Sequence, residues 1–173
     1  MIPRLASALA ALALAVCCVG CAAEPAPAPS ATGFASEEEA FAAAEETYRA
    51  YVDALNHRRA DPNALPSPTD FLVSDALSVD ISTKNEMERE GLTIVGETHI
   101  VEMTRIDDQQ ESSTIWLAVC LDSSATAVVN SRGDDVTPDD RPTLTAVDVH
   151  FAHTPDALVI SSSTTRTVGH CSD

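Results

Sequence analysis

The sequence predicts an α+β fold in which N-terminal helices pack on an antiparallel sheet. Between residues 36 and 90, apolar side chains recur three and four positions apart, which is the spacing of an amphipathic helix. After Gly91, apolar and polar residues alternate in short segments separated by turn residues, as in half-buried strands. Helices followed by hairpin-linked strands are typical of a helical layer that covers one face of a sheet.

The first helix is predicted from Ser36 to about His57. Ser36 and Glu39 form a capping box, because the Ser36 hydroxyl can accept from the third amide of the helix while Glu39 reaches back. The apolar stripe of this helix consists of Phe41, Ala44, Tyr48, Val52 and Leu55.

A second helical region is predicted from about Thr69 to Glu90, with a break near Asp80. Gly91 is expected to end it, since glycine readily adopts the left-handed conformation that follows many helices. Strands are then predicted over residues 92–106, 115–121, 125–130, 143–153 and 158–168, with a polar turn at 107–112 and an acidic loop at 131–142.

Residues 1–20 have the pattern of an export signal. A single positive charge at Arg4 precedes an apolar run over residues 5–16, which is too short to cross a membrane as a helix. The following Val19-Gly20-Cys21 resembles the lipobox of bacterial lipoproteins, although Cys18 stands where leucine is usual. The resemblance implies a diacylglyceryl group on Cys21, with acyl chains such as palmitate. The alternative is a secretory signal cut after Ala23, which would release a free domain.

Residues 21–33 form a Pro/Ala-rich tether that cannot pack a core. In an extended polyproline-like conformation, at about 3.1 Å per residue, it could hold the domain some 40 Å from the membrane. The folded domain is therefore expected to span residues 34–173.

The cysteine count also indicates export. Cleavage before Cys21 removes two of the five cysteines, and the lipid occupies Cys21. Cys120 and Cys171 remain, and two cysteines allow one pairing. A disulfide between them suits an oxidising compartment, and two buried free thiols are the alternative.

With these elements placed, the chain resembles actinobacterial lipoproteins that carry a nuclear-transport-factor-2-like (SnoaL-like) domain. The likeness covers about Phe34 to Cys171 and rests on the long capped helix, the Cys120-Leu121-Asp122-Ser123 element, the turn at 130–133 and the terminal cysteine. The resemblance implies a curved sheet wrapped round the helices into a cone with an apolar pocket. Some members of that superfamily are isomerases or dehydratases, and Tyr48, Tyr51 and Asp122 are the pocket candidates here.

Charge excludes some classes of partner. The chain has 10 Lys and Arg against 27 Asp and Glu, a net charge of -17, so it lacks the basic face that nucleic acid requires. Asp134, Asp135, Asp139 and Asp140 in the acidic loop could offer oxygen ligands to Ca²⁺, but no EF-hand pattern is present and a solvated charge run is more common.

No cofactor, metal site or catalytic residue is predicted. The histidine and cysteine spacings match no zinc site. Asp148 and His150 share one strand face, but Val147, Val149 and Phe151 are expected to take the core face, which turns the pair outward. The expected function is a non-enzymatic envelope lipoprotein on the extracytoplasmic face of the cell membrane, which binds a protein partner or a small apolar ligand. The alternatives are a SnoaL-type enzyme and a freely secreted domain.

Changing Cys21→Ser should abolish lipidation, because the thioether to the diacylglyceryl group needs this thiol. The expected product is an unlipidated protein that leaves the detergent phase on partitioning and lacks the lipid mass by mass spectrometry. A variant that stays in the detergent phase at the unchanged lipidated mass would place the anchor elsewhere.

Overall fold

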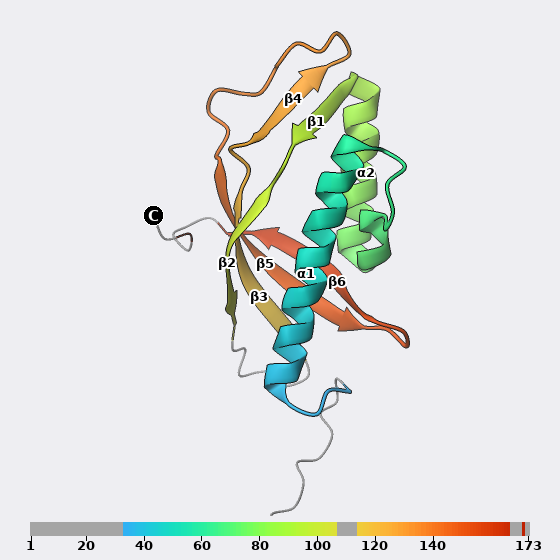
Figure 1. The fold of residues 1–173 in the computed structure, drawn as a ribbon, viewed down its shortest axis with the longest axis vertical. Coiled ribbons are helices and arrows are strands. Elements are labelled where there is room, and N and C mark those ends of the chain that lie inside the picture. The colour runs from blue at the N-terminus through green and yellow to red at the C-terminus, as the bar shows by residue number, and fades with distance from the viewer. Residues whose placement is uncertain (1–32, 107–113, 167–170, 172–173) are drawn as a thin grey trace, which may run out of the picture.

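Two helices lie across one face of a four-stranded antiparallel sheet, and a separate two-stranded sheet extends beyond its end (Figure 1). The computed structural model describes residues 33–106, 114–166 and 171. In chain order the elements are α1 (Glu37–Ala60), the 3₁₀ helix η1 (Pro68–Phe71), α2 (Ser74–Glu90), β1 (Leu92–Gly96), β2 (His99–Arg105), β3 (Ile115–Asp122), β4 (Thr126–Asn130), β5 (Leu144–His153) and β6 (Leu158–Thr165). The predicted α+β class is confirmed.

Helix α1 begins where the capping residues predict. The Ser36 hydroxyl accepts from the Glu39 amide at 3.2 Å, and the Glu39 carboxylate accepts from the Ala35 amide at 2.8 Å. The helix continues to Ala60, slightly past the predicted end at His57. Its inner face carries the buried side chains Ala40, Ala44, Tyr48, Val52 and Ala54.

The predicted break near Asp80 is wrong, because α2 runs unbroken from Ser74 to Glu90. The chain breaks earlier, at Leu72 and Val73. There the Val73 amide donates to the Ile160 carbonyl at 2.9 Å, and Leu72 forms a parallel bridge with Ile160. Gly91 ends α2 in the left-handed conformation, as predicted.

The predicted strand over residues 92–106 is also wrong as a single element, because it divides at Gly96. Gly96 has a φ of 82°, and a Cβ at this position would lie 2.0 Å from the Ala125 carbonyl oxygen. Only glycine fits this kink. As a result β1 pairs with β4 in the small sheet, while β2 pairs with β3 in the large one. The polar turn predicted at 107–112 lies outside the described residues.

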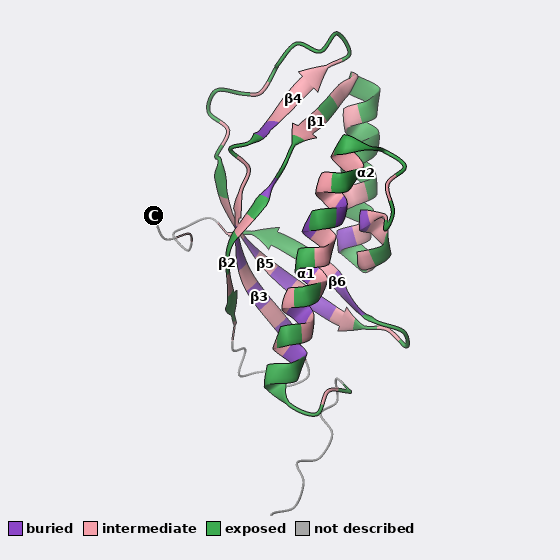
Figure 2. Cartoon of the chain, in the orientation of Figure 1, coloured by how far each residue is buried: buried purple, intermediate pink, exposed green. Residues whose placement is uncertain are grey.

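The large sheet has the strand order β2-β3-β5-β6 and is open, with β2 and β6 at its edges. The predicted core face of β5 is confirmed, since Val147, Val149 and Phe151 are all buried. They pack with α1 and with Ile115, Leu117 and Val119 of β3. Figure 2 shows this buried layer between the helices and the sheet.

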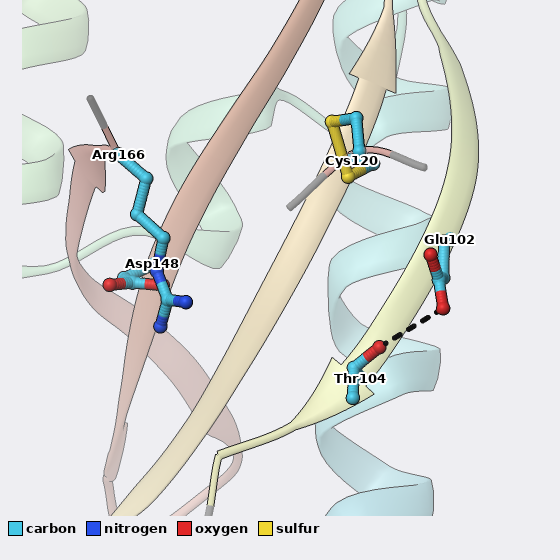
Figure 3. The surroundings of a disulfide bond; sticks show 6 residues. Glu102, Thr104, Cys120, Asp148 and Arg166 are labelled. Carbon is cyan, nitrogen blue, oxygen red and sulfur yellow. Dashed lines mark hydrogen bonds and ion pairs between the residues drawn. A yellow bond between two sulfur atoms is a disulfide. The ribbon is translucent and has the colours of Figure 1, made fainter. Parts of the chain in front are cut away.

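Cys120 and Cys171 form a disulfide, as predicted, with 5.4 Å between their Cα atoms. The bond lies on β3, where Cys120 is paired with Glu102 of β2 (Figure 3). Cys120 alternates with the core residues of β3, so the disulfide is on the face of the sheet away from the helices. It ties the C-terminus to a central strand.

Replacing both cysteines by serine should lower the free energy of unfolding by about 4 kcal/mol. The bond closes a loop across a sequence separation of 51 residues, and the chain-entropy model gives this magnitude for such a loop. Urea unfolding of the variant measures the loss, and the reduced native chain is the control that should match it. A loss under about 1 kcal/mol would contradict this account.

Candidate functional site

A hollow of about 370 Å³ opens between α1, α2 and β6. We call it the tyrosine groove. Tyr48 and Tyr51 of α1 and Ile160 of β6 contribute to its apolar lining, α2 contributes one side, and the end of β6 contributes the other. The lining residues are Tyr48, Tyr51, Leu72, Asp75, Ala76, Val79, Asp80, Thr83, Ile160, Ser162, Ser163 and Thr164.

Tyr48 and Tyr51 lie three positions apart on α1, so both point to the same side of the helix. Their ring centroids are 5.8 Å apart. Burial raises the pKa of both phenols, that of Tyr51 to about 12, so both are protonated at neutral pH. Within the described residues neither hydroxyl has a hydrogen-bond partner, and both tyrosines line the groove.

An ion pair joins the two helices beside Tyr51. Arg58 of α1 donates two hydrogen bonds to the Asp80 carboxylate of α2, at 2.8 and 2.7 Å. The side chains are 22% and 10% exposed, and the hydrogen bonds raise the pKa of Arg58. The charge of Asp80 also contributes to the raised pKa of Tyr51. Because each charge of the pair already faces its opposite, Asp80 offers the groove little net charge.

Asp122, the third pocket candidate, lies elsewhere. It ends β3, where its carboxylate accepts from the Ser124 amide at 2.7 Å. That turn lowers the pKa of Asp122, and the residue opposite it is His99 of β2. The structure thus brings Tyr48 and Tyr51 together and leaves Asp122 outside the groove.

Asp148 and His150 lie on the outer face of the sheet, as predicted. Asp148 forms an ion pair with Arg166 at 2.5 Å (Figure 3). The His150 ring stacks on Trp116, with centroids 4.5 Å apart. The two side chains are therefore engaged with different neighbours rather than with each other.

Two aspartates of the acidic loop accept hydrogen bonds from residues close to them in sequence. Asp134 accepts from Arg132 and Asn130, and Asp135 accepts from the amide and hydroxyl of Thr137. These contacts lower the pKa of both carboxyls. Over the described ranges, no group of three histidine, cysteine, aspartate or glutamate side chains could hold a metal ion.

Two other hollows are less suited to a ligand. One, of about 410 Å³, lies between α1 and the link from β1 to β2. There Asn56 and Arg59 already form hydrogen bonds with Thr98. The other, of about 420 Å³, lies where Phe34 packs on His153 near the start of the domain. Neither is lined by a pair of neighbouring phenols.

The sequence did not indicate Asp80, Ile160 or Ser163 as parts of the site. A cation at the C-terminal end of a helix is favourable by itself, so Arg58 gave no sign of an ion pair. Its partner Asp80 lies 22 residues away on another helix. No periodicity reports such a pairing, since it depends on how the helices pack.

No protein-family model matches the chain, and no curated protein is significantly similar to it. The resemblance to SnoaL-like lipoproteins therefore stays a prediction. No helix in the described part of the chain is long and apolar enough to span a bilayer.

The phenolate absorbance should report this site alone, because Tyr48 and Tyr51 are the only two tyrosines. In the folded protein both should ionise well above the ordinary pKa of about 10, with Tyr51 near 12. The unfolded chain in urea should ionise near 10. The stability linked to these protons is complete below about pH 10 and is lost as the pH rises towards 12.

Tyr48→Phe serves as the control, since it should leave a single transition that belongs to Tyr51. Ionisation of either phenol near pH 10 in the folded protein would contradict the burial described above.

Proposed function

We propose that the protein is a membrane-anchored extracytoplasmic binding module and that the tyrosine groove is its binding site. A lipid on Cys21 anchors the chain, and residues 21–33 hold the domain away from the bilayer. The observation that carries the proposal is the pair of neighbouring phenols, without partners among the described residues, in the lining of a partly apolar hollow.

The lining selects the chemistry of the ligand. Tyr48, Leu72 and Ile160 are buried apolar surfaces, so they favour an apolar body. The neutral hydroxyls favour a hydrogen-bonding group next to that body. The net charge of -17 disfavours anions throughout, so the fitting ligand is neutral or cationic.

Binding suits the groove better than catalysis by a SnoaL-type enzyme. General acid–base catalysis works best with a pKa near the operating pH, and burial moves the pKa of Tyr51 to about 12. Both carboxylate oxygens of Asp80 already accept hydrogen bonds from Arg58. These groups can orient a ligand without reacting with it.

The anchoring rests on the N-terminal sequence. The lipobox-like Val19-Gly20-Cys21 follows the apolar run directly, and the Cys120–Cys171 disulfide suits an exported domain. Release as a free domain would leave the groove unchanged, so the two parts of the proposal are independent.

Val79→Asp should weaken binding of the neutral apolar dye N-phenyl-1-naphthylamine by about tenfold. Val79 lines the groove and is 61% exposed, and the added carboxylate removes apolar contact surface there. Dye fluorescence measures the affinity. Ile81→Asp is the matched control, because Ile81 is a 46% exposed apolar residue on the same helix outside the groove lining. Equal affinities of the two variants, or no dye binding by the native protein, would contradict the proposed site.

A further inference from the structure

The free edge of β6 forms one side of the tyrosine groove. Ser162, Ser163 and Thr164 line the hollow, and the residues from Ser163 to Thr165 are exposed. Figure 2 shows this end of β6 in green. The groove therefore combines an apolar lining with an exposed strand edge.

The backbone groups at this edge point outward at alternate residues. The Arg166 amide donates to the Ala146 carbonyl of β5, and the antiparallel register continues through Thr164 and Asp148. Hydrogen-bonded pairs alternate along such a ladder, so Ser163 and Thr165 direct their N–H and C=O groups away from β5. An extended segment lying in the groove could bond to both residues.

The chain itself already uses this edge once. Val73 donates to Ile160, and Leu72 forms a parallel bridge with the same residue. The chain then turns away into α2 at Ser74. In the described part of the chain, no other strand pairs with this side of β6 beyond Ile160.

The two edges of the sheet differ in their protection. The β2 edge carries Glu102 and Arg105 and a bulge at Val101, and charges and bulges are the usual means of discouraging strand addition. The bulge of β6 lies earlier, at Ser161, and the stretch from there to Thr165 has neither charge nor proline. The unprotected edge is thus the one beside the groove.

From this geometry we infer that the groove takes an extended polypeptide segment, which adds to β6 as a strand. The inference rests on the proposed binding function and names its ligand class. An apolar side chain of the segment packs on Tyr48 and Tyr51, and its backbone pairs with Ser163 and Thr165. Asp75 lines the groove and has no ion-pair partner among the described residues, so a basic side chain is favoured.

Selection from a phage-displayed library of linear random peptides on the disulfide-bonded protein tests this inference. The expected peptides combine apolar and basic residues, bind with a dissociation constant below about 100 μM and are displaced by N-phenyl-1-naphthylamine. N-methylation of successive peptide nitrogens should reduce affinity at every second position only, because alternate N–H groups face β6.

Ser163→Pro removes the outward N–H and should weaken the selected peptide by at least about tenfold. Ser163→Ala keeps that N–H and should change affinity by less than about twofold. Retained dye binding shows that the proline variant is folded, and the methylation series needs no variant at all. If no peptide is selected while the dye binds, or if the methylation series lacks the period of two, the inference is wrong and the groove stays a small-ligand site. If neither dye nor peptide binds, the proposed function falls as well.

Discussion

The contacts of Leu72 and Val73 with Ile160 fix where α2 begins, and the groove depends on them. The Val73 amide bonds to the Ile160 carbonyl, and Ala76 one turn later packs in the core, so the start of α2 is held against β6. A second contact is the ion pair between Arg58 and Asp80, which joins α2 to α1 through two hydrogen bonds. Held at these points, α2 packs lightly and buries only Ala76. A helix that covered the sheet more fully would fill the hollow that Tyr48 and Tyr51 line.

Gly96 is a second constraint, because it separates the two sheets. A side chain there would collide with the Ala125 carbonyl, so the chain can turn from β1 into β2 only with glycine. The turn leaves β1 and β4 beyond the end of the large sheet (Figure 1). The helices can then cross the large sheet and still contact the small one, and the sheet remains open at β6.

Local patterns predicted the elements well, and long-range contacts account for the errors. The capping residues at Ser36 and the alternation through Val147 and Phe151 are read from neighbours in sequence, so they were correct. The break at Leu72 and the kink at Gly96 depend on Ile160 and Ala125, which are distant in sequence. For the candidate site, the sequence spacing of Tyr48 and Tyr51 predicts that they share one helix face. That Asp122 lies outside the groove depends on where the end of β3 lies in the fold, which the sequence pattern does not show.

The exposed end of β6 beside the groove lies far from the start of the described domain. Phe34 packs on His153, the last residue of β5, so the start of the described domain lies close to the turn from which β6 begins. From Leu158 to Thr165 the strand rises roughly 3.4 Å per residue, which places its exposed residues, Ser163 to Thr165, about 17 to 24 Å from its start at that turn. A domain anchored through Phe34 would therefore hold its free strand edge away from the attachment point. A partner could approach this edge without competing with the bilayer, whereas a site beside Phe34 would lie at the attachment point.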